Sequence, residues 1–98
     1  MNTEKIHKLK LDIEFCDAVL NGNKSFELRI NDRGFQKGDF IKFTAKDKIS
    51  TCQHPINNEM FQITYVLNGY GLKKDFVCLA IKKCQPISRD LIDYELQL

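Results

Sequence analysis

Three ionic side chains lie close together in the stretch GNKSFELR, residues 22–29. Glu27 and Arg29 are two positions apart, which in a β-strand puts both side chains on one face about 6–7 Å apart. Lys24 can reach the same space. A guanidinium fork and a mobile ammonium suit a phosphate or a carboxylate, and a glutamate can orient the arginine or accept a proton. The alternative is a surface ion pair that stabilises by about 0–1 kcal/mol.

Two further stretches could extend a site of this kind. Asp32 and Arg33 stand in NDRG, directly after the expected strand, where the alternative is a turn in which the aspartate caps its own backbone. Tyr70 stands between two glycines, and its ring could stack on an unpaired base. It could equally fold back onto the rim of the domain.

The cysteines favour reduced thiols over disulfides or a metal site. Cys16, Cys52, Cys78 and Cys84 show no CxxC spacing. His54 could form a zinc site with Cys52, Cys78 and Cys84, but the spacing of these residues matches no common zinc finger or zinc ribbon. We expect no metal and no cofactor, and we interpret the cysteines as small buried hydrophobic residues.

Length, composition and charge limit the class of protein. The 98 residues predict a single domain over 1–98, with 86–98 as a C-terminal extension. No apolar run approaches the roughly 18 residues that a membrane span needs. The start MNTEKIHKLKLD lacks the apolar core of a secretory signal, so we expect a cytoplasmic protein. The formal net charge of +2 is small, but the acidic extension leaves the rest of the chain mildly basic.

The elements that must position these residues are strands and one helix. Helical spacing of apolar residues predicts a helix from Asp12, as N-cap, to about Asn21, with Gly22 ending it. A long loop that can contain a short edge element is expected over 46–59. Near the C-terminus a short helix capped by Ser88 is expected, with a strand or a frayed end as alternatives. Alternation of side chains predicts strands over residues 5–11, 25–30, 40–45, 61–67 and 76–82.

The same alternation predicts which faces are buried. The apolar residues of 25–30 are expected to face inward, with Glu27 and Arg29 on the other face. Alternate residues from Phe61 to Leu67 are expected to share one face. The strand 76–82 is apolar on both faces and is expected to be covered on both sides. His7 lies on an apolar face and is interpreted as a structural histidine. The predicted fold is α+β and mainly β, a small curled sheet or barrel with one helix at an outer face or an end.

Three blocks of sequence resemble the ASCH superfamily, the activating-signal-cointegrator homology domains of PUA-like fold. GNKSFELR fits its signature GxKxxExR, with Gly22, Lys24, Glu27 and Arg29 in place. Together with IHKLKL and ITYVLNGYGLKKDFVCLAI, the run DAVLNGNKSFELRINDRGFQKGD is similar to a branch of small uncharacterised bacterial and phage proteins. The similarity runs through 6–81 except for the loop 46–59. It implies a PUA-like β-barrel with a cleft beside the first helix, lined by the signature residues.

Three functions are compatible with the residues and the resemblance. We expect an RNA- or nucleotide-binding module whose ligand contacts are Lys24, Glu27, Arg29, Asp32, Arg33 and Tyr70. The first alternative is a small hydrolase acting on a modified nucleoside or RNA, with Lys24 and Glu27 sharing proton transfer. Amidohydrolase-like relatives are expected to carry a threonine nucleophile where this chain has Glu27, which weakens the acyl-transfer version. The second alternative is a phage or host protein-interaction adaptor that uses the acidic C-terminal segment.

Overall fold

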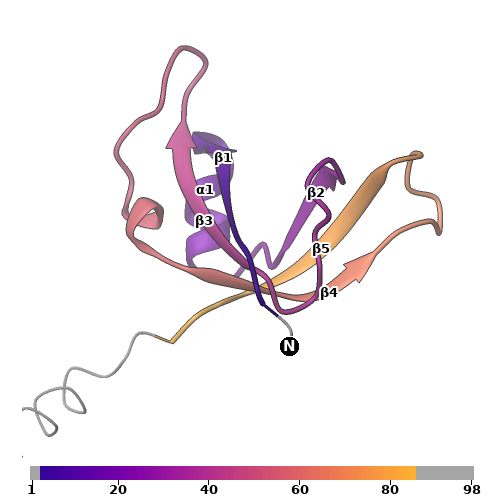
Figure 1. Cartoon of the computed structure of the whole chain (residues 1–98). Coiled ribbons are helices and arrows are strands. Elements are labelled where there is room, and N and C mark those ends of the chain that lie inside the picture. Colours follow the sequence, from indigo (N-terminus) through magenta and orange to yellow (C-terminus); the bar gives the residue numbers. More distant parts are fainter. Residues whose placement is uncertain (1–2, 86–98) are drawn as a thin grey trace, which may run out of the picture.

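The computed structural model describes residues 3–85, which fold into a five-stranded sheet with one α-helix and one 3₁₀ helix (Figure 1). The fold is mainly β, as the sequence predicted. The C-terminal helix expected from Ser88 lies outside the described residues. In chain order the elements are β1 (Ile6–Asp12), α1 (Ile13–Leu20), β2 (Phe26–Ile30), β3 (Phe40–Lys46), η1 (Pro55–Asn58), β4 (Phe61–Leu67) and β5 (Phe76–Lys83).

The sheet is curled into a half-barrel with the strand order β1-β3-β4-β5-β2. β1 and β3 are parallel, whereas the other neighbouring pairs are antiparallel. The ladder between β3 and β4 is short, with Phe40 opposite Gln62 and Ile41 opposite Phe61. Two arms therefore diverge from this point, one made of β1 and β3 and the other of β4, β5 and β2 (Figure 1).

The edge strands β1 and β2 face each other across the opening of the half-barrel, and two arginine side chains bridge them. Arg29 donates from Nη2 to the carbonyl of Lys10 at 2.7 Å, and Arg33 donates from Nη1 to the carbonyl of Lys8 at 2.9 Å. Both carbonyls belong to β1. Guanidinium groups thus take the place of the ladder that a closed barrel would have here.

The core fills the concave side of the sheet. α1 buries Cys16 and Val19 against it and packs on β1, β3 and η1. His7 is also buried, and its Nε2 lies 2.8 Å from Oδ2 of Asp39, as expected for a structural histidine. The buried hydrophobic residues are Leu9, Leu11, Cys16, Val19, Phe35, Ile41, Phe43, Ala45, Ile56, Phe61, Ile63, Val77, Leu79 and Ile81.

The prediction that the apolar face of β2 looks inward is wrong. Glu27 pairs with Leu79 and Arg29 with Val77, and directly opposed residues share a face of the sheet. Because Leu79 and Val77 are buried in the core, the ionic face of β2 is the concave one. The apolar residues Phe26, Leu28 and Ile30 are 46%, 53% and 52% exposed on the convex side.

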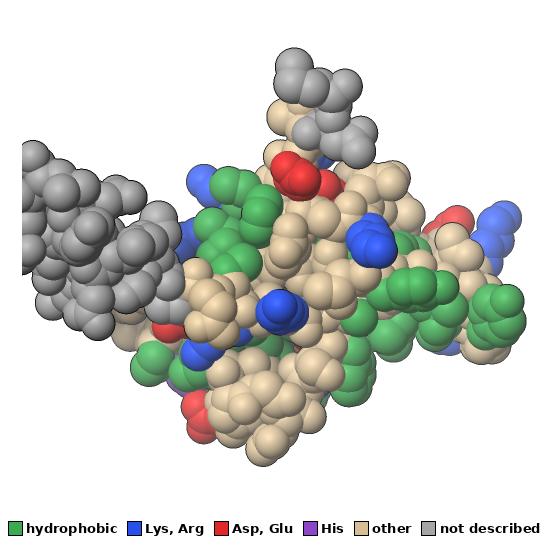
Figure 2. Space-filling model, turned by 90° about the horizontal axis from the view of Figure 1, so that it is seen from below, with side chains coloured by type: hydrophobic (Ala, Val, Ile, Leu, Met, Phe, Trp, Pro, Cys, Tyr) green, Lys and Arg blue, Asp and Glu red, His purple; other side chains and the backbone are tan. Residues whose placement is uncertain are grey.

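Two further expectations about faces are wrong on β4 and β5. A bulge between Ile63 and Tyr65 shifts the register, so Ile63 is buried while Tyr65 is exposed. Within residues 3–85, β5 is not covered on both sides as expected, because its convex residues, such as Phe76 and Cys78, are only partly buried. Figure 2 shows hydrophobic side chains gathered on this side of the molecule.

Within residues 3–85, neither helix has the length and apolar character that a bilayer crossing requires.

Candidate functional site: an ionic cleft between β1 and β2

The end of α1 determines where Lys24 lies. The helix ends at Leu20, and Gly22 follows with φ +84°, in the left-handed region that glycine favours. The backbone N–H of Lys24 then donates to the carbonyl of Ala18 at 2.9 Å, which folds the segment back onto the helix. Lys24 is thereby held at the entrance of β2, beside the concave face.

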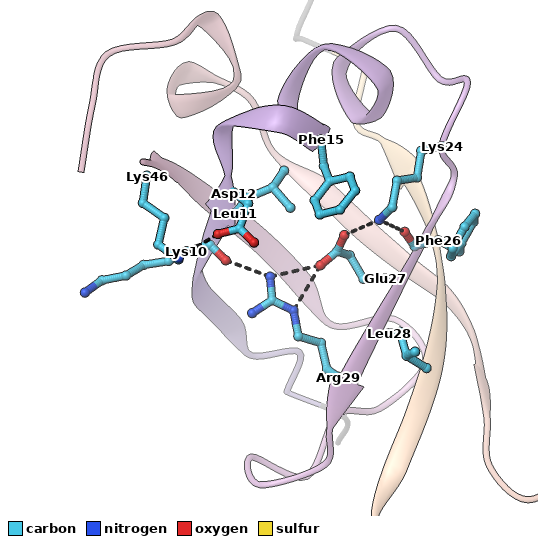
Figure 3. A pocket seen from close by; sticks show the side chains of 10 residues that line it. All are labelled: Lys10, Leu11, Asp12, Phe15, Lys24, Phe26, Glu27, Leu28, Arg29 and Lys46. Atoms are coloured by element: carbon cyan, nitrogen blue, oxygen red, sulfur yellow. Dashed lines mark hydrogen bonds and ion pairs between the residues drawn. The ribbon is translucent and has the colours of Figure 1, made fainter. Parts of the chain in front are cut away.

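Glu27 is the centre of the cluster. The residue is only 3% exposed, and both carboxylate oxygens have a charged donor. Nζ of Lys24 donates to Oε1 at 2.6 Å, and Nε of Arg29 donates to Oε2 at 2.9 Å (Figure 3). A nearly buried carboxylate is stable only when paired in this way. Glu27 therefore fixes the positions of the two cations.

Lys24 is held by aromatic rings as well as by oxygen atoms. Nζ also donates to the carbonyl of Phe26 at 2.9 Å. It lies 5.3 Å from the ring centre of Phe15 and 4.7 Å from that of Phe26, distances that permit cation–π attraction. The two hydrogen bonds use two of the three ammonium protons, so one remains to be donated.

Arg29 keeps part of its guanidinium available. Nε and Nη2 both contact Glu27, and Nη2 also donates to the carbonyl of Lys10. No hydrogen bond from Nη1 to any residue of 3–85 accompanies these three contacts. Figure 3 shows Nη1 beside the cleft without a partner among the residues drawn. The two N–H groups of Nη1 form one side of the planar fork that recognises carboxylate or phosphate oxygens.

These side chains line a cleft of about 350 Å³ between β1, the start of α1 and β2 (Figure 3). Four of its side chains are bases and two are acids, so the cleft is basic although aromatic rings contribute to its wall. Asp12 pairs with Lys46 at its margin. The lining residues are Lys10, Leu11, Asp12, Phe15, Lys24, Phe26, Glu27, Leu28, Arg29 and Lys46.

The structure brings together three of the six residues expected at the site. Lys24, Glu27 and Arg29 converge in the cleft, whereas Asp32 and Arg33 line a second hollow of about 270 Å³ next to it, which Arg29 shares. Nε of Arg33 lies 3.6 Å from Oδ1 of Asp32. Tyr70 does not line the cleft: it is 92% exposed in the connection between β4 and β5, with φ +52°.

Seven of the ten lining residues were not singled out from the sequence as ligand contacts, and four of these seven are Lys10, Asp12, Phe15 and Lys46. Lys10 belongs to β1 and Lys46 to β3. Only knowledge that these strands pair in parallel, with Asp12 opposite Lys46, would have placed the two lysines at the cleft. Phe15 belongs to α1 and is 39% exposed at the cleft. Asp12 was expected to cap α1, yet its side chain makes no capping hydrogen bond and pairs with Lys46 instead.

The groups with shifted pKa values in the interior lie apart from the cleft. Burial raises the pKa of the Cys16 thiol, and the nearby Cys52 adds to the effect. Burial alone would raise the pKa of Asp39, but hydrogen bonds from His7, Lys5 and Gln36 outweigh it and lower the pKa below 3.8.

His54 contacts a carboxylate and not a metal-binding set of residues. Its Nε2 lies 2.7 Å from Oδ1 of Asp17, and its Nδ1 accepts from the backbone of Ile56. Over the described part of the chain, no three His, Cys, Asp or Glu side chains converge as a metal site would require.

The fold and the cleft define a small half-barrel domain with an ionic site on one edge strand. The chain belongs to a family described as "Domain of unknown function (DUF3850)", whose model matches residues 6–81. It is also similar to an "Uncharacterized 12.9 kDa protein in GpA 3'region" of Escherichia phage P2, at 43% identity over 37 residues. That match covers 38% of this chain and 34% of the phage protein, so the chain spans about a third of the relative's length.

Proposed function

We propose that this chain is an ASCH-type domain of PUA-like fold that binds RNA or a nucleotide-like ligand in the cleft between β1 and β2. The signature residues Lys24, Glu27 and Arg29 lie side by side on the concave face, where the resemblance implies a ligand. The family match over residues 6–81 covers the same three blocks of sequence on which the resemblance rests.

The observation that supports the proposal best is that Glu27 fixes two cations that still have free donors. Its buried carboxylate holds Arg29 and Lys24 in place, while Nη1 of Arg29 and one proton of Lys24 remain as donors. Donors fixed in advance bind an anion with little loss of side-chain entropy. Phosphate oxygens match these donors in charge and geometry.

Aromatic surface beside the cations favours a ligand that carries a base as well as a phosphate. Phe15 is 39% exposed and lines the cleft, whereas Phe26 is 46% exposed and borders it from the convex side of β2. The Phe15 ring is placed to stack on a nucleobase whose phosphate faces Arg29 and Lys46. A volume of about 350 Å³ is in the range of pockets that hold small organic ligands.

The geometry gives the hydrolase alternative no specific support. Glu27 is only 3% exposed and both of its oxygens accept hydrogen bonds from cations, so a substrate has little access to the carboxylate. The ten lining residues include no serine, threonine, cysteine or histidine that could act as a nucleophile. The adaptor alternative relied on the acidic C-terminal segment, which lies outside the described residues.

The test is a thermal-shift and titration screen of the full chain with nucleosides, nucleoside monophosphates and short single-stranded RNAs. A ligand that binds the native state raises the melting temperature, and binding through phosphate weakens as salt increases. We expect Arg29→Ala to reduce affinity by about 10- to 100-fold, as loss of a bidentate charged contact does.

The matched control is Lys73→Ala, which removes one positive charge from an exposed residue outside the cleft. It is expected to leave affinity nearly unchanged at physiological salt. Equal losses in the two variants, or no stabilisation by any ligand of the panel, would rule out the proposed site. If the chain released product from an acetylated nucleoside and Lys24→Ala abolished this activity, the hydrolase alternative would replace the proposal of a binding module.

A further inference from the structure

The convex side of the second arm carries an apolar surface that we call the outer apolar face. Strand register places alternate residues of three paired strands side by side on it. Figure 2 shows hydrophobic side chains gathered here. The face consists of Phe26, Leu28 and Ile30 of β2, Tyr65 and Leu67 of β4, and Phe76, Cys78 and Ala80 of β5.

The size of this face limits what could cover it. Three strands and about five residue positions give roughly 14 Å by 17 Å, on the order of 240 Å². A stable contact with a second copy buries about 800 Å² on each partner, well above this value. One short segment of chain fits the face better. Leaving it bare would expose several large hydrophobic side chains in a row, which monomeric proteins avoid.

We propose that residues 86–98 of the same chain pack their apolar side chains on the outer apolar face. Only Cys84 and Gln85 separate this segment from β5, whose residue Ala80 lies on the face. Thirteen residues reach up to about 43 Å when extended, enough to cross the face from end to end. Its apolar residues are Ile87, Leu91, Ile92, Tyr94, Leu96 and Leu98.

Charge favours the same arrangement. The segment carries the acids Asp90, Asp93 and Glu95 against the single base Arg89. Lys82 follows Ala80 on the convex side of β5 and is exposed, and further lysines precede the strand at its other end. Covalent attachment also keeps the segment at a millimolar effective concentration near the face, so weak contacts suffice.

The proposed contact would affect the cleft because β2 has one face on each. Leu28 lies on the outer apolar face and also borders the cleft that its neighbours Glu27 and Arg29 line. A segment packed behind β2 would therefore stabilise the strand that carries the site. The contact does not require a ligand, so it can fail or hold independently of the proposed function.

Disulfide trapping with Cys78 tests the proposal. Cys78 is on the face, and Cys16 is completely buried, so Cys52→Ser and Cys84→Ser leave one accessible thiol. In this background we expect Leu96→Cys to form an intramolecular disulfide at least about tenfold faster than Gln97→Cys under mild oxidation. Consecutive side chains diverge by about 100° in a helix and 180° in a strand, so position 97 is a matched control.

Two outcomes of the trapping experiment would overturn the proposal. Equal rates at positions 96 and 97 mean that the segment does not dock. Disulfide-linked dimers as the main product mean that a second copy covers the face. A second measurement avoids the cysteine variants: in the full chain, Leu96→Asp should speed amide hydrogen exchange in β2 and increase binding of a hydrophobic dye, whereas Gln97→Asp should change neither. Identical exchange in the two variants would also count against the contact.

Discussion

Glu27 and Asp39 are both carboxylates with almost no exposed surface, yet their surroundings differ in one respect. All donors to Asp39, from His7, Gln36 and Lys5, lie within the fold, and they tie the turn before β3 to β1. The donors to Glu27 stand at an open cleft and retain unused N–H groups. Burial of a charged group alone therefore does not mark a site; what distinguishes Glu27 is that its partners can still bind something else.

Glu27→Leu is expected to have the largest effect. It leaves Lys24 and Arg29 without their carboxylate in a partly desolvated position, and we expect a loss of about 3 kcal/mol in the free energy of unfolding. Urea denaturation measures this loss. Ligand binding should fall as well, because both cations lose their fixed orientation. A stable variant with unchanged affinity would show that Glu27 does not organise the cleft.

Asp39→Asn is expected to reduce stability by about 1.5–3 kcal/mol at pH 7, because charge-assisted hydrogen bonds are replaced by weaker ones. Affinity for the ligand should stay within about twofold, since Asp39 does not line the cleft. A large loss of affinity in a folded Asp39→Asn protein would remove the distinction between the two carboxylates.

Acidification should reduce the difference between Asp39→Asn and the unchanged chain. The pKa of Asp39 is lower in the folded state than its ordinary value of 3.8, so the group stabilises the fold above that pH. This contribution is lost as the pH falls below 3.8 through the folded-state pKa. Stability curves of both proteins from pH 7 to pH 2 should converge at the acidic end. Curves that stay parallel would contradict the assignment.

Arg29→Lys keeps the charge and removes the planar fork. We expect affinity for a phosphate-bearing ligand to fall by about tenfold, with less than about 1 kcal/mol lost in stability. Isothermal titration calorimetry and urea denaturation give the two numbers. If Arg29→Lys binds as well as the unchanged chain, charge alone and not fork geometry recognises the ligand.

Asp32→Ala is expected to have the smallest effect. Its pair with Arg33 is exposed and 3.6 Å long, so stability should change by less than about 0.5 kcal/mol. The affinity of the cleft should also change little. A clear loss of affinity would extend the site into the second hollow.

The sequence predicted the order of the strands and α1 and the convergence of Lys24, Glu27 and Arg29, because local alternation and helix termination determine both. It did not predict η1, which lies in the expected 46–59 loop. It did not predict which face of β2 is concave. Alternation puts Phe26 and Leu28 on one face of β2 and Glu27 and Arg29 on the other. Only the pairing of β2 with β5 decides which of these two faces lies inside. The contributions of Lys10 and Lys46 were missed for the same reason, since they depend on contacts between distant strands.

The parallel pairing of β1 and β3 has a consequence for how the domain folds. Two parallel strands cannot be joined by a tight turn, so residues 13–39, with α1 and β2, form the crossover that links them. This ladder is non-local and must wait for the crossover to close. The segment that holds Lys24, Glu27 and Arg29 is thus also the connection on which completion of the sheet depends. Insertions or deletions in it would therefore disturb folding of the sheet before they changed ligand affinity.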